Sequence, residues 1–502
     1  MKKTVLLPIA FCLMIFSCGK DISTIESNLG APQIEGFSPI EGQVGQSIRI
    51  IGRNFGSSIA DKTVKIGNTV ATVTGSTETE IFITIPDGAI SGAISIAVAG
   101  QTTYTVDSLI VANELDFTAD NIDTLNIILS ENNLNLHTNE VYNLTATISG
   151  QHSDTIKWFS ENPDIVTVDD TGNLTALQTG ATNINARIGN VIKSCYVNVE
   201  PNIYVLGSQF NDNVGTYNVT LWINNEPFII EKATQAGSIF VHNSDVYIAG
   251  ESVNENGPYE FATVWKNGVP MHLSSGLSYA EARSVFVEAE NVYVAGREWE
   301  NTDVSKVWKN GELLYTLTDG TYSSRVHSVF VDDGDIYVAG YESVESVDVA
   351  KVWKNGIPAD LSKNGNAHSV SVYDDIVFAA GFESNFATVW TNGSSNTLTN
   401  GLNLAMANSI LLDGRKVYAC GFERIGEGEI AILWENGTRT NLTEGVGHAD
   451  ANSIFKHSTN IYVAGWEQIG NMDVGKVWKN GELYFTLNTN GDSSRAFSIF
   501  VK

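Results

Sequence analysis

The chain has 502 residues, of which 17% are charged and 10% aromatic, and it contains 45 glycines. That length exceeds one ordinary core, and this composition argues against disorder or long helices and for turn-rich β-structure. The 57 acidic and 29 basic residues give a net charge of -28, which repels phosphate backbones, so we expect no nucleic-acid partner and attribute the acidity to solubility.

The N-terminus carries the signs of export. Two lysines precede an apolar run at 5–16, which is too short to span a bilayer but typical of a signal-peptide core. The run ends in Ile15-Phe16-Ser17-Cys18, which resembles the lipobox of bacterial lipoproteins. The resemblance implies a signal peptide at 1–17 and Cys18 as the lipid anchor that holds the chain at a membrane. The alternative is an ordinary secretory signal with a chance cysteine.

The residues after this cysteine bear on the destination. In lipoproteins, an Asp at this place favours retention in the inner membrane, whereas this chain has Gly19 followed by Lys20 and Asp21. That pattern is similar to the export signals of some surface lipoproteins. We therefore expect a lipid-anchored outer-membrane protein that faces the cell exterior. Residues 18–31 form a short polar linker.

Two cysteines remain once Cys12 is cleaved off and Cys18 is lipidated. Cys195 and Cys420 fall in different predicted domains, each within an apolar alternating run. A disulfide framework is therefore not expected. Cys420 replaces the alanine of a repeat and is predicted to pack as a small buried residue.

The first folded unit is predicted at 32–112. Apolar residues alternate between Gly and Pro turns, which indicates the short strands of a β-sandwich. Gly52-Arg-Asn-Phe-Gly56 and Val64-Lys-Ile-Gly67 resemble elements of the IPT/TIG immunoglobulin-like fold. Such modules occur in bacterial surface proteins and in some transcription factors, and the lipobox favours the first context.

A second sandwich is predicted at 123–200, after a polar connector at 113–122. The order Trp158-Phe-Ser160, Val166-Thr-Val-Asp169 and Gly172-Asn-Leu-Thr-Ala176 resembles a bacterial Ig-like group 2 domain. Trp158 is predicted to fill its core, since a large ring usually occupies the centre of a small sandwich. Together the two modules are expected to act as a stalk.

The remainder, 201–502, is a repeat array. A Tyr-x-Ala-Gly motif or a near variant ends at seven glycines: Gly207, Gly250, Gly296, Gly340, Gly381, Gly421 and Gly465. A Val/Leu-Trp follows each one, at Trp222, Trp265, Trp308, Trp353, Trp390, Trp434 and Trp478. Most of these tryptophans stand in Trp-Lys-Asn-Gly, and Asn-Gly supplies the two positive φ angles of a tight hairpin.

A further apolar strand begins at a serine in every copy, at Ser238, Ser284, Ser328, Ser369, Ser409, Ser453 and Ser498. Each period therefore holds four antiparallel strands in about 40 to 50 residues, the size of one β-propeller blade. The array begins with a second strand at Ile203 and ends with a first strand at Ser498. We predict an all-β protein whose seven-bladed propeller is closed when the last strand completes the first blade.

The phase of the repeat separates two faces of the propeller. Turns from first to second strand and the Asn-Gly hairpins are short and uniform, so they build one plain face. Loops from second to third strand, and those leading into each Ser strand, vary in length and content. Because variable loops on a rigid scaffold concentrate binding residues, the opposite face is the predicted site of function.

Aromatic residues on the variable face are the first ligand-binding candidates. Packing between blades explains the seven repeat tryptophans and leaves Trp299 and Trp466. An exposed ring could stack on a sugar or on a partner's side chain. Trp466 shares its place with Tyr341, Phe382 and Phe422, for which packing within the blade is the alternative reading, whereas Trp299 breaks the pattern.

The residue before each repeat serine forms a second set. It comprises Gly237, Arg283, His327, His368, Asn408, Asn452 and Phe497. In a propeller this position opens the innermost strand, so Arg283, His327 and His368 are predicted to line an arc of the channel mouth and hydrogen bond a polar ligand. The alternative is polar residues at solvated strand starts.

Repeated glutamates stand two residues after the motif glycine, at Glu298, Glu342, Glu383, Glu423 and Glu467. General acid/base catalysis needs two carboxylates in different environments, so we interpret these as structural hydrogen-bond acceptors. The histidines lack metal-ligand spacing, and the sequence has no nucleotide or nucleophile motif. No metal, cofactor or catalytic residue is predicted.

The sequence thus predicts a surface lipoprotein whose propeller binds an extracellular polysaccharide or protein. The rival hypotheses are a glycan-cleaving propeller enzyme and a scaffold component of an envelope complex. Binding is favoured over catalysis because a reaction centre needs residues that occur once, and the blades are regular.

Overall fold

The computed structural model describes residues 31–98, 100–112, 125–150, 155–211, 214–489 and 491–502. The predicted signal peptide and Cys18 lie outside these residues. Contacts divide the chain into two compact units, one with the N-terminal modules and one with the repeats. The described residues form strands and loops, and they include no helix that is long and apolar enough to cross a membrane.

The described residues of the first module form a β-sandwich of eight strands. They are β1 (Gln33–Ser38), β2 (Glu41–Gln43), β3 (Ser47–Arg53), β4 (Lys62–Ile66), β5 (Thr69–Ser76), β6 (Glu80–Thr84), β7 (Gly92–Val98) and β8 (Gln101–Ala112). They hydrogen bond in the order β1-β3-β6-β5-β4-β7-β8-β2.

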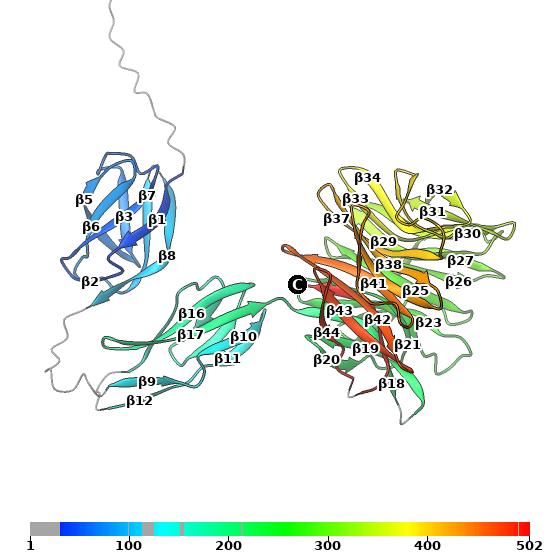
Figure 1. Ribbon diagram of the computed structural model, residues 1–502, viewed down its shortest axis with the longest axis horizontal. Coiled ribbons are helices and arrows are strands. Elements are labelled where there is room, and N and C mark those ends of the chain that lie inside the picture. Colours follow the sequence, from blue (N-terminus) through cyan, green and yellow to red (C-terminus); the bar gives the residue numbers. More distant parts are fainter. Residues whose placement is uncertain (1–30, 99, 113–124, 151–154, 212–213, 490) are drawn as a thin grey trace, which may run out of the picture. The chain divides into compact units, whose positions relative to one another are not determined.

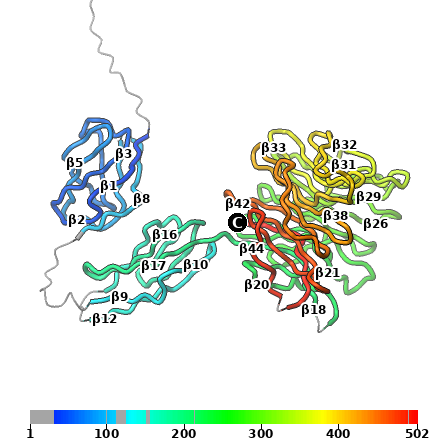
Figure 2. Tube along the Cα trace, viewed as in Figure 1, coloured from blue at the N-terminus to red at the C-terminus, as the bar shows by residue number. Residues whose placement is uncertain are grey.

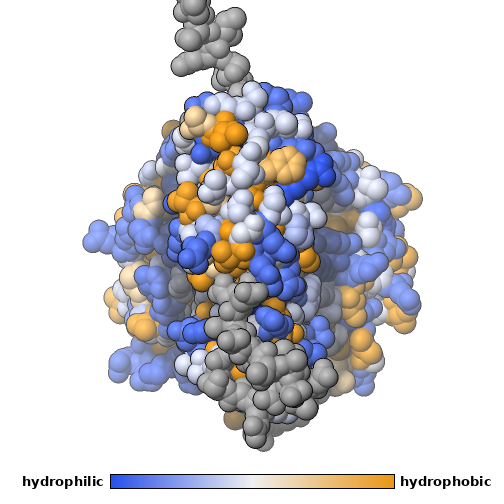
Figure 3. All heavy atoms as spheres, turned by 90° about the vertical axis from the view of Figure 1, so that its left-hand side faces the viewer, coloured by the Kyte–Doolittle hydropathy of each residue, from blue (hydrophilic) through white to orange (hydrophobic). Residues whose placement is uncertain are grey.

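Alternation along these strands builds the core of the first module. In β3, Ile48 and Ile50 are buried on either side of the exposed Arg49, as expected for a strand with one face in the core. Figure 3 shows hydrophobic residues among hydrophilic ones on the face that it turns to the viewer. Such single exposed apolar groups are ordinary on a protein surface.

Nine strands are described in the second module. They are β9 (Asn126–Leu129), β10 (Asn133–His137), β11 (Val141–Asn143), β12 (Ala146–Ser149), β13 (Lys157–Ser160), β14 (Val166–Val168), β15 (Asn173–Ala176), β16 (Gly180–Ile188) and β17 (Val191–Glu200). They form sheets ordered β10-β17-β16-β13, β11-β15-β14 and β12-β9.

The core of the second module differs from the prediction in one respect. Trp158 is only partly buried, and a Cβ added to Gly172 would meet its indole at 3.1 Å. Aliphatic residues such as Leu144 and Leu174 are fully buried instead. Cys195 is buried and free, as is Cys420 in the repeats.

The repeat unit consists of seven four-stranded antiparallel sheets, here called blades 1 to 7. Blade 1 contains β45 (Ser494–Val501), β18 (Ile203–Asn211), β19 (Thr216–Ile223) and β20 (Glu226–Ile229). Blade 2 contains β21 (Ala233–His242), β22 (Asp245–Ser252), β23 (Phe261–Lys266) and β24 (Val269–His272). Blade 3 contains β25 (Ala280–Glu288), β26 (Asn291–Trp299), β27 (Asp303–Lys309) and β28 (Glu312–Thr316).

The remaining blades follow the same order from inner to outer strand. Blade 4 contains β29 (Ser324–Asp332), β30 (Asp335–Val344), β31 (Val347–Lys354) and β32 (Ile357–Lys363). Blade 5 contains β33 (Gly365–Tyr373), β34 (Ile376–Glu383), β35 (Phe386–Thr391) and β36 (Ser394–Thr397). Blade 6 contains β37 (Ala405–Asp413), β38 (Lys416–Ile425), β39 (Gly428–Glu435) and β40 (Thr438–Asn441). Blade 7 contains β41 (Ala449–His457), β42 (Asn460–Ile469), β43 (Met472–Lys479) and β44 (Glu482–Thr486).

Blade 1 joins the two ends of the array. The last strand, β45, pairs antiparallel with β18, from Ile203 opposite Val501 to Gln209 opposite Ser494. Figure 2 shows the red C-terminal strands beside the green β18 and β20. The order of the sequence motifs predicts this shared blade, since the first repeat lacks a Ser strand and the last one has nothing else.

The repeat tryptophans pack between blades, as predicted. All seven are at most 2% exposed, and each belongs to a cluster with residues of the preceding blade. Trp434 of blade 6, for example, packs with Ala380 and Val389 of blade 5. Trp222 of blade 1 packs with Tyr462 and Val477 of blade 7, so this packing also joins the last blade to the first.

The hairpin asparagines add a second repeated contact. In Asn267-Gly268 the φ angles are 51° and 78°, as a tight hairpin requires. The Asn267 Oδ1 accepts a hydrogen bond from the Val246 N–H at 2.8 Å, and the equivalent bond recurs in every blade. These bonds fix the plain face of the propeller.

Candidate functional site

Each innermost strand has a β-bulge at the same place. Pairing between the first and second strands skips the residue before the repeat serine. In blade 4, Val326 pairs with Gly340 and Ser328 pairs with Ala339, while His327 between them has no pairing partner on the second strand. The same shift occurs in the other six blades. A bulge re-aims the side chain of its extra residue, and here the seven extra residues are those that precede the repeat serines.

The glycine of the Ala-Gly motif makes room for this bulge. A Cβ on Gly340 would lie 2.1 Å from the carbonyl oxygen of Arg325, and one on Gly381 would lie 1.9 Å from that of Asn366. The other five motif glycines meet the equivalent carbonyl at 1.9 to 2.2 Å. No other residue fits so close to a neighbouring backbone. The motif glycine, which is the same in every blade, therefore allows the bulge residue to turn into the mouth.

The repeat serines link the blades into a ring. The Ser238 Oγ of blade 2 accepts a hydrogen bond from the Val285 N–H of blade 3 at 2.8 Å. Equivalent bonds from each serine to the next blade follow around the propeller. The Ser498 Oγ of blade 1 accepts from the Ile239 N–H of blade 2 at 3.2 Å, which completes seven bonds.

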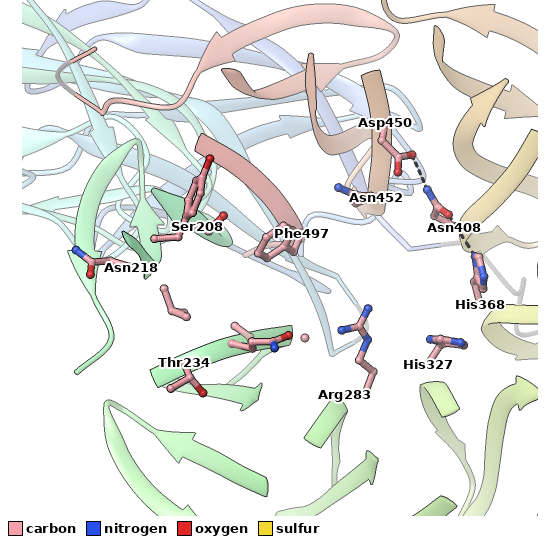
Figure 4. Close-up of a pocket in the computed structure, with 15 residues that line it drawn as sticks. Ser208, Asn218, Thr234, Arg283, His327, His368, Asn408, Asp450, Asn452 and Phe497 are labelled. Carbon is pink, nitrogen blue, oxygen red and sulfur yellow. Dashed lines mark hydrogen bonds between the residues drawn. The ribbon is translucent and has the colours of Figure 1, made fainter. Parts of the chain in front are cut away.

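All seven bulge residues line one cavity of about 540 Å³, called the mouth from here on. Figure 4 shows side chains from several blades pointing into it, with the Arg283 guanidinium between Phe497 and His327. The bulge residue of blade 2, Gly237, has no side chain. Ser208, Tyr217 and Asn218 of blade 1 also contribute to the lining. The bulges lie near the start of each inner strand, beside the variable loops that lead into these strands.

A phenylalanine arc lies deeper along the same strands. It comprises Phe455, Phe500, Phe240, Phe286 and Phe330, whose neighbouring ring centroids are 4.4 to 5.1 Å apart. Each ring stands three residues after a bulge residue, or about 10 Å further along an extended strand. The polar mouth therefore has an apolar layer beneath it.

A hydrogen-bonded series of side chains crosses blades 5 to 7 at the mouth. The Asp450 Oδ1 accepts from the Asn408 Nδ2 at 2.6 Å, and the Asn408 Oδ1 lies 3.2 Å from the His368 Nδ1. Figure 4 draws both interactions. Because Asn408 uses its oxygen toward the imidazole, His368 donates from Nδ1 and keeps the Nε2 lone pair as an acceptor.

His327 is oriented in a similar way. The Asn366 Nδ2 donates to the His327 Nε2 at 3.2 Å, which leaves the proton of this neutral imidazole on Nδ1. The two imidazoles meet edge to face at 5.1 Å between ring centroids. Tyr341 stacks on His327 at 6.1 Å and Phe382 meets His368 at 5.7 Å, so aromatic rings of the second strands hold both.

Burial sets the protonation of these groups. It holds the pKa of His327 well below its usual value, with nearby His368 and Arg283 adding to the effect, and it lowers the pKa of His368 to about 4. Both imidazoles are therefore neutral at pH 7. Burial also raises the pKa of Asp450 to about 7, and the charge of Glu429 contributes.

A smaller cavity of about 290 Å³ adjoins the mouth and is called the side chamber. Gln235, Arg283 and His327 line both spaces. Arg297 and Arg325 from blades 3 and 4 complete much of its wall.

The structure brings Arg283, His327 and His368 into one cavity. The two tryptophan candidates are placed differently. Trp299 is 51% exposed at the end of β26, outside the lining of both cavities. The Arg495 guanidinium lies 4.1 Å from the centre of the Trp466 ring, so one face of this ring already has an intramolecular partner.

The repeated glutamates form ion pairs within blades. Glu298 bonds Lys306 at 2.7 Å and Glu342 bonds Lys351 at 3.4 Å, while Glu423 and Glu467 pair with Arg439 and Lys476. For these four the interpretation as structural acceptors is confirmed. Among the described residues, no group of three or more His, Cys, Asp or Glu is arranged to hold a metal ion.

Sequence reasoning missed a second set of inner-strand residues, two before the bulge. It comprises Gln235, Glu281, Arg325, Asn366, Met406, Asp450 and Arg495. Each pairs with the residue after the motif glycine, as Asp450 does with Trp466. In all seven copies the missed residue is followed by a buried Ala or Val, then by the bulge residue, then by the repeat serine. Because side chains alternate along a strand, this spacing could have placed the missed residue beside the bulge residue on the mouth side.

Two family models match the N-terminal modules. Residues 32–119 match the IPT/TIG domain and residues 124–199 match the bacterial Ig-like domain (group 2), which confirms both predicted resemblances. No curated protein matches the chain.

Several solved structures align with this chain at low identity. An auxiliary nutrient binding protein from Bacteroides thetaiotaomicron covers 78% of this chain and 95% of its own, at 12% identity and a TM-score of 0.26. Another from Bacteroides ovatus covers 90% and 98%, at 13% identity and a TM-score of 0.25. A periplasmic gluconolactonase from Pseudomonas aeruginosa covers 60% and 99%, at 12% identity and a TM-score of 0.36. Likenesses this distant carry no argument about function.

Proposed function

We propose that this chain is a lipid-anchored outer-membrane protein whose propeller mouth binds a carbohydrate chain outside the cell, with the two Ig-like modules as its stalk. One observation carries the proposal. Seven identical bulges aim largely different side chains into a single cavity of about 540 Å³. A scaffold that repeats its backbone and varies the residues at its mouth is suited to recognition.

The chemistry of the mouth suits a sugar. Amides, imidazoles and a guanidinium supply hydrogen-bond donors and acceptors, and the Phe497 ring supplies an apolar face. Carbohydrates present hydroxyl groups that donate and accept, together with apolar ring faces. The fixed tautomers of His327 and His368 add directional specificity.

A glycan-cleaving enzyme is the second candidate, and Asp450 is the observation in its favour. Its raised pKa would suit a general acid. Glycoside hydrolysis commonly needs two carboxyl groups about 5 to 9.5 Å apart across the scissile bond. Asp450 is the one carboxylic acid among the described residues that line the mouth, so binding accounts for the lining better than hydrolysis does.

A protein partner is the third candidate, favoured by the rim around the mouth. Leu277, Leu402 and Val446 are 83%, 82% and 90% exposed. Each lies in a loop that leads into an inner strand, on the same side as the mouth. Exposed apolar tips of this kind commonly contact other proteins.

A glycan array with the mature chain tests the proposal. We expect binding that His368→Ala weakens at least tenfold. His242→Ala is the matched control, because His242 ends the inner strand of blade 2 on the plain face, and it should bind as the unchanged protein does. Equal binding by both variants contradicts the mouth as the site. Release of shortened glycans would instead support the enzyme, and absence of glycan binding would favour a protein partner.

The anchor needs a separate test in cells. We expect metabolic labelling with a fatty acid to mark the chain and Cys18→Ala to abolish the label. External protease should then digest the propeller on intact cells. A labelled chain that resists protease until the outer membrane is opened would contradict the exterior location but not the anchor.

A further inference from the structure

The side chamber is built around three guanidinium groups. Arg283 comes from the bulge of blade 3, Arg297 from its second strand and Arg325 from the inner strand of blade 4. All three line the same space of about 290 Å³. Three like charges this close require anions to balance them.

Two carboxylates are shared among these arginines. The Glu281 carboxylate lies 3.2 Å from Arg283 and 2.9 Å from Arg297. Asp303 pairs with Arg297 and lies 3.3 Å from Arg325. Counting these five groups leaves one positive charge without a counterpart.

A third carboxyl group nearby does not fully supply the missing charge. Glu251 is 2% exposed and accepts a hydrogen bond from the Tyr279 hydroxyl at 2.8 Å. Burial raises the pKa of Glu251 to about 7, so this group is only partly ionised at neutral pH. The Tyr279 ring itself lies 5.0 Å from the Arg297 guanidinium.

Two of the three guanidinium groups are exposed, and Arg283 also lines the mouth. The side chains of Arg283 and Arg325 are 43% and 47% exposed, whereas that of Arg297 is 12% exposed. Within the described residues, Glu281 engages Nη1 of Arg283 and Asp303 engages Nε of Arg325. Each guanidinium has five N–H groups, so both keep donors for a planar anion.

The opposite side of the mouth has different chemistry. There Asp450, Asn408 and Asn452 line the wall, and neither the Asp450 carboxyl group, whose pKa is raised to about 7, nor the neutral amides carry a positive charge that would attract an anion. The mouth is thus polarised, positive toward blades 3 and 4 and neutral to negative toward blades 6 and 7. In a chain of net charge -28, a local positive site is a specific feature rather than a consequence of composition.

We propose that the side chamber binds an anionic substituent, a carboxylate or a sulfate, on the carbohydrate seated in the mouth. This inference rests on the proposed function and names the ligand class as acidic glycans. Arg283 and Arg325 would hold the anion through paired N–H groups, since a guanidinium matches both carboxylate and sulfate oxygens. Arg297, held by Glu281 and Asp303, acts as a positioning residue.

Titration calorimetry on the mature chain tests this with three probes. They are a uronic-acid oligosaccharide, the same oligosaccharide with its carboxyl groups reduced to alcohols, and a sulfated neutral oligosaccharide. We expect at least one anionic probe to bind at least tenfold more tightly than the reduced one. The preference should shrink as salt rises, because Arg283 and Arg325 are exposed to screening.

Arg325→Gln should reduce this preference to less than threefold, and Arg325→Lys should restore part of it, because lysine keeps the charge without the fork. Arg495→Gln is the control, since Arg495 is as exposed as Arg325, also pairs with an aspartate and lies outside the chamber lining. It should leave the ratio of affinities as it is.

The outcomes separate this inference from the proposed function. Preference for the uronic acid alone assigns a carboxylate to the chamber, and preference for the sulfated probe alone assigns a sulfate. If the reduced oligosaccharide binds equally well, or if Arg325→Gln keeps the preference, the chamber is not an anion site although glycan binding stands. If none of the probes binds and a glycan array is also blank, the proposed function itself fails.

Discussion

Two sets of positions on the same blades follow opposite rules. The shared ring, defined as the motif glycines, the repeat serines and the repeat tryptophans, has the same residue in every blade and is largely buried or hydrogen bonded. The mouth positions, adjacent in sequence, differ between most blades and face a cavity. Because the shared ring sets the same backbone in every blade, the residues at the mouth can change without altering the fold.

The two regions also differ in what they contribute to stability. The shared ring buries large apolar groups and closes hydrogen bonds between blades, which stabilises the propeller. The mouth instead buries a carboxyl group and two imidazoles, which burial disfavours in their charged forms. Substitutions in the two regions should therefore change the free energy of unfolding in opposite directions.

The largest effect is expected from a tryptophan of the shared ring. Trp434→Ala would leave a cavity between blades 5 and 6 and should lower the free energy of unfolding by about 3–5 kcal/mol. Trp299→Ala removes the same side chain from a site that is 51% exposed and should cost less than about 0.5 kcal/mol. Thermal unfolding followed by tryptophan fluorescence measures both variants. Similar shifts in the unfolding temperature would contradict the expected difference between the shared ring and the exposed site.

A shared glycine should come next. Gly381→Ala would place a Cβ 1.9 Å from the Asn366 carbonyl oxygen, so the bulge must move, at about 3 kcal/mol. In the same blade, Gly393→Ala meets nothing within 4 Å and should cost about 1 kcal/mol for its positive φ alone. Calorimetric melting of the two variants compares them. Equal costs would mean that the bulge does not depend on its glycine.

The opposite sign is expected at the mouth. Asp450 has a pKa of about 7 in the folded chain, raised mainly by burial, and about 3.9 when unfolded. The folded state therefore holds its proton more tightly, and the cost of ionising it grows as pH rises from about 4 to 7. Asp450→Asn should raise the free energy of unfolding by about 2 kcal/mol at pH 8, allowing for partial contact of the cavity with water.

That gain should fade toward pH 4, where the carboxyl group is protonated in both states. Denaturant unfolding at pH 8, 6 and 4 follows the trend. Asp473→Asn is the control, because Asp473 forms an ion pair with Arg495 and its loss should not stabilise the chain. If the Asp450→Asn variant is less stable than the unchanged protein at pH 8, Asp450 stabilises the fold. The mouth would then not differ from the shared ring in the sign of its effect on the free energy of unfolding.

The blades could be predicted from sequence because seven copies display each position seven times. The Asn-Gly turns, the tryptophans and the order of strands each have a local cause. A single copy is enough to predict the hairpin turn, and the full set of copies is enough to predict that the two ends of the array share the first blade. Arg283, His327 and His368 followed from the same comparison, since all three precede a repeat serine.

Other features depend on contacts that the sequence does not display. Arg325 and Asp450 were missed because their position carries a different residue in nearly every copy, and only the pairing across the bulge shows its direction. Arg495 lies 4.1 Å from the Trp466 ring although the two are far apart in sequence. Trp158 is partly exposed because aliphatic side chains already fill the second module.

The smallest effect is expected from one bond of the serine ring. Ser238→Ala removes the acceptor for the Val285 N–H, now 2.8 Å from the serine oxygen. A lost hydrogen bond with its donor left in place costs about 1 kcal/mol. Ser244→Ala, in an exposed turn on the plain face, should cost less than about 0.5 kcal/mol.

Hydrogen exchange at Val285 gives the sharper readout of this prediction. The amide should exchange faster in Ser238→Ala, while the equivalent Val329 amide, whose acceptor Ser284 is intact at 3.0 Å, should keep its protection. Glycan affinity at the mouth should not change, because Ser238 is outside the mouth lining. A loss of affinity would show that the mouth depends on the shared ring and would contradict the independence of the two sets of positions.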